Sequence, residues 1–180
     1  MPRILAIDPS LTSTGIARID RDATGNRWSA DLYCIKSKPN GNTMQATHRR
    51  IAAILHEVRK ELDRMPQAVA MEAPAFASNS GSAMSRSWLW GRIYDAAAGL
   101  GVPIYVVTTN QRMKYATGKG NTGKDGVLAA AIHQWPDVGI KGNDEADALI
   151  VGAVTCRAIG LPIDTWPAGH YPFLDKVQHS

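Results

Sequence analysis

Two short apolar runs in this chain end abruptly in an acidic residue, and this pattern restricts the folds that the chain can adopt. The run ILAI is followed by Asp8, and the run AVAM is followed by Glu72. A carboxylate at the end of a buried strand is costly unless a cation lies against it. If the two runs are neighbouring strands, the fold must bring positive charge to the edge where both acids lie.

A second pair of acids lies in the helix-like segment NDEADALIVGAV. Asp144 and Asp147 are three residues apart and therefore share one face of a helix. Asn143 as an N-cap, together with the helix dipole, explains Asp144 and Glu145 without any function. These effects do not explain Asp147, which stands among apolar residues where a core side chain is expected.

The first two acids also have simple structural explanations. Asp8 precedes Pro9, which favours an extended backbone and suits the start of a turn, and Glu72 can form an ordinary salt bridge. These separate explanations weaken if the two strands are neighbours and the last helix packs near their ends, because all four acids then meet. Carboxylate oxygens favour hard cations, Mg²⁺ or Mn²⁺ over zinc, and two such ions about 4 Å apart can promote phosphodiester hydrolysis.

The periodicity of apolar residues indicates an α/β chain with the order β-β-β-α-β-α-β-α-α. An initial antiparallel meander followed by crossovers predicts a mixed sheet with helices on both faces. A basic, glycine-rich stretch, RMKYATGKGNTGK, separates the fifth strand from the next helix. The expected elements are strands at 3–8, 16–20 and 28–35, a helix at 44–62, a strand at 68–72, a helix at 83–100, a strand at 102–107, and helices at 125–135 and 144–159.

The size and composition of the chain indicate a single soluble domain in a cytoplasmic setting. The 180 residues are 44% hydrophobic and 20% charged, and no apolar run approaches the roughly 20 residues that span a bilayer. We expect no signal peptide, no membrane association, and reduced cysteines. We expect a domain at 1–160 and, at 161–180, a tail rich in proline and aromatic residues that packs on the domain or on a dimer.

The positive net charge mildly favours a protein that binds nucleic acid. The net charge is +4, and setting aside the four acids leaves twenty basic against twelve acidic residues, or +8. Glycines in the basic stretch would let the backbone approach phosphates, although a solvated charged loop is the alternative. The two tryptophans of the 83–100 helix suit the core or a dimer interface better than base stacking. The candidate DNA-contacting cations are Arg112, Lys114, Lys119 and Lys124 in the basic stretch and Arg86 and Arg92 on that helix.

Four segments, in their order and spacing, carry a resemblance to a known family. IDPSLTSTGIARI, MEAPAFASN, MKYATGKGNTGK and NDEADALIVGA resemble the RuvC-type Holliday-junction resolvases of the RNase H-like superfamily, over about residues 3–158. The resemblance implies a mixed five-stranded sheet, an antiparallel meander plus parallel strands, flanked by helices. It also implies catalysis with two Mg²⁺ ions, which Mn²⁺ can replace. The carboxylates matched by position are Asp8, Glu72, Asp144 and Asp147.

The resemblance extends to the DNA and to the assembly. Lys114 and Lys124 match lysines of the family's junction-binding stretch, where they are expected to assist catalysis, and Phe76 lies near an aromatic that opens the junction. Ser10 departs from the family, which usually has glycine there. A homodimer that makes paired nicks in DNA recombination and repair is implied, and a phage-encoded member is plausible. The sequence does not indicate whether branch-migration proteins are partners.

Three other functions compete with this hypothesis. The opening D-x-x-x-x-S-T-G resembles the phosphate loop of actin-like ATPases and sugar kinases, but those proteins need two lobes. A non-catalytic DNA-binding module would leave the four acids without a role. Nucleases that cut RNA–DNA hybrids or flaps share the same metal chemistry. We therefore expect a Mg²⁺-dependent, structure-selective endodeoxyribonuclease that resolves Holliday junctions or related branched DNA.

Overall fold

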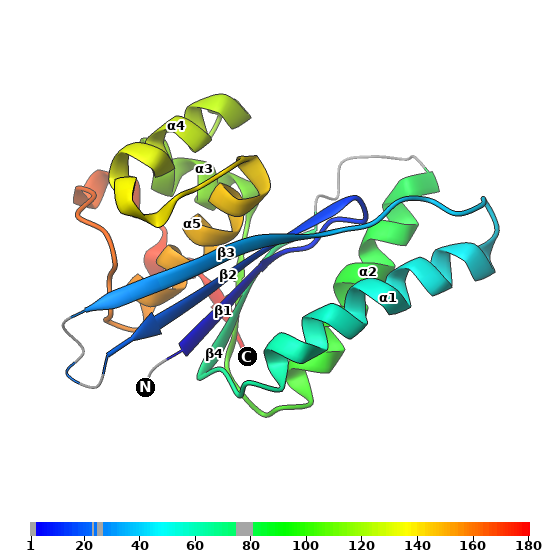
Figure 1. Cartoon of the computed structure of the whole chain (residues 1–180). Helices are drawn as coiled ribbons and strands as arrows, with labels where there is room; N and C mark the ends of the chain where they lie inside the picture. The colour runs from blue at the N-terminus through cyan, green and yellow to red at the C-terminus, as the bar shows by residue number, and fades with distance from the viewer. Residues whose placement is uncertain (1–2, 23, 25–26, 75–80) are drawn as a thin grey trace.

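A mixed six-stranded sheet forms the centre of the protein, with the strands in the order β3-β2-β1-β4-β5-β6 (Figure 1). The computed structural model describes residues 3–22, 24, 27–74 and 81–180. Strands β1, β2 and β3 form an antiparallel meander, β4 and β5 extend it in parallel, and β6 pairs antiparallel with β5. The strands are β1 (Arg3–Asp8), β2 (Ser13–Arg21), β3 (Trp28–Lys36), β4 (Ala68–Glu72), β5 (Ile104–Val107) and β6 (Gln178–His179).

Helices cover both faces of this sheet, as Figure 1 shows. The helices are α1 (Met44–Leu62), α2 (Gly81–Ala98), α3 (Thr109–Thr117), α4 (Lys124–Gln134) and α5 (Asn143–Ala158). Successive side chains of β1 point to opposite faces of the sheet and therefore pack into two separate cores. Leu5 and Ile7 pack with residues of α1 and α2, whereas Ile4 and Ala6 pack with residues of α3, α4 and α5.

The expected architecture is confirmed, with two additions. The helix at 44–62 and the strand at 68–72 have the expected bounds. Helix α3 lies where the sequence suggested only a basic, glycine-rich stretch, because Thr108 and Gln111 form a capping box and Gly118 ends the helix in a left-handed conformation, with φ of 74°. The short strand β6 adds a sixth strand that the sequence did not predict.

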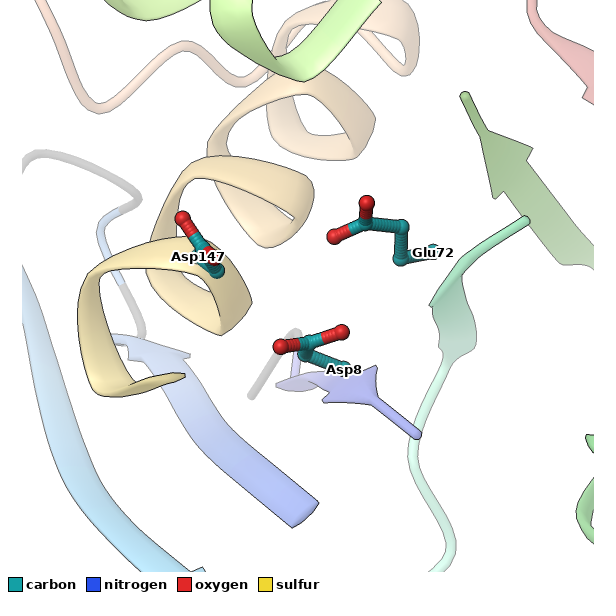
Figure 2. A group of neighbouring side chains, drawn as sticks. All are labelled: Asp8, Glu72 and Asp147. Carbon is teal, nitrogen blue, oxygen red and sulfur yellow. The ribbon is translucent and has the colours of Figure 1, made fainter. Parts of the chain in front are cut away.

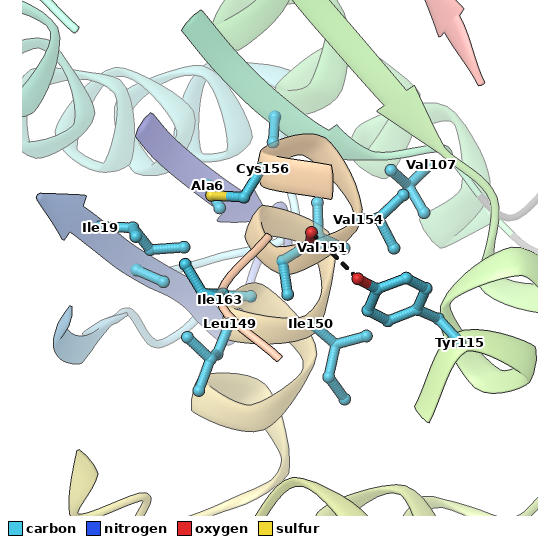
Figure 3. Close-up of a cluster of buried hydrophobic side chains, with 14 of the residues drawn as sticks. Ala6, Ile19, Val107, Tyr115, Leu149, Ile150, Val151, Val154, Cys156 and Ile163 are labelled. Atoms are coloured by element: carbon cyan, nitrogen blue, oxygen red, sulfur yellow. Dashed lines mark hydrogen bonds between the residues drawn. The ribbon is translucent and has the colours of Figure 1, made fainter. Parts of the chain in front are cut away.

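Helix α5 is enclosed on nearly all sides. Every residue from Glu145 to Cys156 is buried, which fits a helix that is apolar around its whole circumference. Figure 3 shows its side chains packed between β1 and β2 on one side and Tyr115 of α3 on the other, whose hydroxyl oxygen lies 3.3 Å from the carbonyl oxygen of Ala153. The proposed N-cap at Asn143 is wrong: Gly142 is the cap, and Asn143 is the first helical residue.

Two glycines allow α5 to lie unusually close to the sheet. A Cβ atom at Gly15 of β2 would overlap the backbone carbonyl of Asp144, and a Cβ atom at Gly152 would lie 3.0 Å from the Cβ atom of Ala6. Gly15 is paired with Asp8 in the β1–β2 ladder. The start of α5 is therefore held directly over the end of β1.

The segment after α5 is bound to the rest of the protein. Ile163 and Val177 are buried in the same core as α5. Asp164 accepts a hydrogen bond from the Tyr115 hydroxyl at 2.6 Å and forms an ion pair with Arg157. Among the described residues, each helix is either too short or too polar to cross a membrane.

Substitution of Gly15 by alanine should destabilise the protein by about 1–3 kcal/mol, because the new methyl group meets a backbone atom that cannot rotate away. The matched control is Gly91→Ala in α2, where a Cβ atom meets nothing within 4 Å. That change should be neutral or stabilise the helix by up to about 1 kcal/mol. Urea unfolding measures both effects, and a Gly15→Ala protein as stable as the wild type would contradict the packing described.

Candidate metal centre

Three carboxylates from three elements meet at one end of the sheet (Figure 2). Asp8 is the last residue of β1, Glu72 is the last residue of β4, and Asp147 lies in the second turn of α5. One oxygen atom from each lies within 4.8 Å of the others. The parallel pairing of β1 with β4 and the close packing of α5 on β1 bring the three carboxylates together. The structure thus gathers three of the four predicted acids.

The fourth acid, Asp144, lies one turn earlier on α5 and is half-buried. It does not belong to the group of three, but its charge raises the pKa of both Asp8 and Asp147. It also lines a hollow between the start of α5 and strands β2 and β3. Asp144 therefore stands at the margin of the cluster, between the acids and this hollow.

A buried arginine lies among the acids. Arg112 of α3 places Nε 2.8 Å from Oε2 of Glu72, and its Nη1 pairs with Asp147. Only 5% of Arg112 is exposed. The sequence counted Arg112 among the DNA-contacting cations; in the structure its side chain is buried and paired with Glu72 and Asp147.

Glu72 is held by several neighbours. Its Oε1 atom accepts a hydrogen bond from the Thr109 hydroxyl at 2.6 Å, and its backbone carbonyl accepts one from Trp90 Nε1 at 2.8 Å. Its Oε2 atom is buried and lacks an aligned hydrogen bond, although Arg112 is close. A buried carboxylate oxygen in this condition, beside two further carboxylates, fits the oxygen-only donor set that a hard divalent cation prefers.

Burial and repulsion from neighbouring carboxylates make Asp8 and Asp147 hard to ionise. Burial raises the pKa of Asp8 well above its usual range, and the charges of Glu72 and Asp147 raise it further. Burial also raises the pKa of Asp147 to about 6, against the opposing effect of the Arg112 charge. Burial and the neighbouring carboxylates therefore favour the protonated forms of Asp8 and Asp147.

Among the predicted lysines, Lys124 lies near this cluster. It begins α4, is exposed, and is close enough for its charge to lower the pKa of Asp147. Lys114 is half-buried on α3, and Lys119 is exposed in the loop between these two helices. The basic stretch thus brings one cation, Lys124, near the acids.

The remaining predicted contacts differ in position. Arg86 of α2 lines the same small hollow as Asp8 and Glu72. Arg92 lies six residues further along α2, about 120° around the helix axis, and within the described residues it does not line that hollow. Phe76 lies outside the described residues.

Sequence reasoning missed several residues around the site. Thr109 and Trp90, which hold Glu72, gave no signal as positioning residues, because their partner is distant in sequence. A second set of exposed lysines, Lys36, Lys38 and Lys141, lines the hollow beside Asp144. Only the fold brings Lys141, just before α5, next to the end of β3.

The sheet order, the helices on both faces and the acids at the strand ends define an RNase H-like protein with three carboxylates grouped where they could hold a metal ion. Residues 4–155 match the family described as crossover junction endodeoxyribonuclease RuvC. Because this match covers most of the chain, the chain belongs to the RuvC family.

Similar proteins agree with this assignment. The RuvC of Geobacter sulfurreducens is 28% identical over 163 residues, which cover 87% of this chain and 92% of that protein. The RuvC of Pseudarthrobacter chlorophenolicus is 27% identical over 126 residues, which cover 69% of this chain and 64% of that protein.

Solved structures show the same fold. Thermus thermophilus RuvC superposes with a TM-score of 0.67 at 24% identity, covering 88% of this chain and 97% of that chain. The same protein in complex with a Holliday junction substrate gives a TM-score of 0.67 at 23% identity, covering 89% of this chain and 98% of that chain.

Without metal, wild-type protein should lose stability relative to Asp147→Asn as the pH rises from about 4 to 6. In this range the unfolded-state carboxyl ionises, whereas the folded-state carboxyl, with its pKa raised to about 6, stays protonated. Above about pH 6 the wild type carries the full loss of stability that comes from the raised pKa of Asp147. Urea unfolding in EDTA at several pH values measures the difference.

The control is Asp95→Asn, which removes an exposed carboxylate from α2. Its stability should follow the wild type across the same pH range. Parallel curves for Asp147→Asn and wild type would show that Asp147 carries no raised pKa.

Proposed function

We propose that this protein is a metal-dependent endodeoxyribonuclease that resolves Holliday junctions, or related branched DNA, by paired nicks. The observation that carries the proposal is the meeting of Asp8, Glu72 and Asp147 at one end of the sheet in a member of the RuvC family. Relatives named as crossover junction endodeoxyribonucleases, and a Thermus thermophilus relative solved with a Holliday junction substrate, support it.

Asp8, Glu72 and Asp147 would hold the cations, with Asp144 at the margin of the cluster. The oxygen-only donors favour Mg²⁺, with Mn²⁺ as a substitute, and we propose two ions per site. Bound Mg²⁺ would supply an activated water and would stabilise the charge that develops on the phosphate. Thr109 and Trp90 orient Glu72 for metal binding, and the packing of α5 on the sheet fixes the position of Asp147.

The DNA backbone would cross the acids between two sets of cations. Lys124 lies near Asp147, Lys114 and Lys119 belong to the same basic stretch, and the hollow lined by Lys36, Lys38 and Lys141 adjoins Asp144. Lysines near a phosphodiester position the strand and contribute affinity without reading sequence. Such an arrangement suits an enzyme that selects DNA by its branched shape.

Paired nicks require two active sites. We propose a homodimer, because a two-fold symmetric assembly presents two identical sites to the two equivalent strands of a four-way junction. Cleavage of opposite strands would then convert the junction into two duplexes.

Substitution of Asp8 by asparagine should slow the cutting of four-way junctions in Mg²⁺ by about a thousandfold, because the cluster loses a central charge. Junction binding should be retained. Cleavage of labelled four-way, three-way and flap DNAs and of an RNA–DNA hybrid measures both the rate and the substrate. The control is Asp175→Asn, an exposed acid near the C-terminus. Wild-type rates in Asp8→Asn, or no junction cleavage by the wild type, would refute the proposal.

The double substitution Lys114→Ala and Lys124→Ala should weaken junction binding. If both lysines contact phosphates, the slope of log affinity against log salt should fall by about 2. Fluorescence anisotropy in EDTA, at several salt concentrations, measures this slope. The control is Lys60→Ala, since Lys60 lies on α1 and pairs with Glu57 at 2.7 Å. An unchanged slope in the double variant would remove these lysines from the DNA-binding surface.

A further inference from the structure

We propose that Arg112 is a resident cation of the metal centre, which occupies the Glu72–Asp147 side of the carboxylate cluster and limits how tightly the DNA-free protein binds a divalent ion. Arg112 is in this sense a positioning residue that acts through the carboxylates. The inference rests on the proposed metal centre, and it assigns a role to a residue that the sequence placed on the DNA surface.

The contacts of Arg112 involve the same carboxylates that a metal ion would need. Its Nε atom is 2.8 Å from Oε2 of Glu72, and its Nη1 atom pairs with Asp147. The two acids come from β4 and α5, and the arginine comes from α3. Arg112, Glu72 and Asp147 are 5%, 8% and 4% exposed, so water screens their charges little.

The pairing with Glu72 is held by charge more than by hydrogen-bond geometry. The Nε atom of Arg112 and the Oε2 atom of Glu72 are both buried, and neither makes an aligned hydrogen bond. A pairing of this kind is easier to exchange for a metal–oxygen bond than a well-aligned one. Glu72 would stay in place during the exchange, because Thr109 holds its other oxygen.

The backbone that carries Arg112 is held in place, and its side chain is buried. Arg112 lies between the capping box at Thr108 and the fully buried Tyr115 on the same short helix. Its positive charge therefore stays near the ion in a poorly screened site and repels it. A neutral residue of similar size should remove this repulsion, and it should also leave the metal-free acids uncompensated.

The alternative is a purely structural role, in which Arg112 only holds the two carboxylates in the correct geometry. The two roles predict opposite signs for the change in metal affinity. Loss of a scaffold weakens Mg²⁺ binding, whereas loss of a competing cation strengthens it.

The test compares Arg112→Gln and Arg112→Lys with wild type in Mg²⁺ titrations by calorimetry, without DNA. Arg112→Gln should bind Mg²⁺ at least about tenfold more tightly and should melt at a lower temperature in EDTA. Arg112→Lys keeps the charge, so its affinity should stay within about threefold of the wild type. Equal or weaker Mg²⁺ binding by Arg112→Gln would overturn the inference.

A second measurement uses the wild type and does not depend on the folding of any substituted protein that lacks the charge. The Nε–H resonance of Arg112, assigned by its absence in Arg112→Lys, should shift as Mg²⁺ is added, and an unmoved resonance at saturation would refute the exchange. If the wild type binds no Mg²⁺ in calorimetry, the proposed metal centre fails together with this inference. If the wild type binds Mg²⁺ and Arg112→Gln gains no affinity, only the inference fails.

Discussion

The close packing of α5 on the sheet is the constraint on which the rest of the structure depends. Gly15 and Gly152 remove the side chains that would hold the helix away from β1 and β2. The helix can then be buried on all sides, with α3, α4 and the C-terminal segment covering its outer surface. As a result, one acid of this apolar helix lies against two acids at the ends of strands, without any flexible loop between them.

The same burial creates the electrostatic problem that the site must solve. Water is largely excluded from Asp8 and Asp147, so burial disfavours their ionised forms. The negative charges of neighbouring carboxylates add to this effect, and the pKa values of both acids are raised. A bound divalent ion would relieve this repulsion, and the charge of Arg112 already offsets part of it. Under the proposed function, the acids would therefore have two sources of positive charge, a metal ion from solution and the arginine of the chain itself.

The sequence predicted the parts of the site whose signal is local. Asp8 and Glu72 stood out because each ends an apolar run, and Asp147 because it interrupts one. The burial of Arg112 was not predicted, because a sequence shows the charge of a side chain but not whether the helix turns it toward solvent or toward the interior. Helix α3 was missed although Thr108 and Gln111 have capping-box spacing. Thr109 and Lys141 gained their positions only from contacts between distant elements.

The C-terminal segment contacts the two helices that carry Arg112 and Asp147. Asp164 joins Arg157 of α5 to Tyr115 of α3, and His170 Nδ1 lies 2.8 Å from the Tyr115 carbonyl oxygen. Tyr115 is one turn from Arg112 on the same helix. The segment also covers the outer edge of β5, where unpaired backbone groups would otherwise invite another strand. Removal of this segment would therefore loosen the helix that carries Arg112 and expose a sheet edge prone to aggregation.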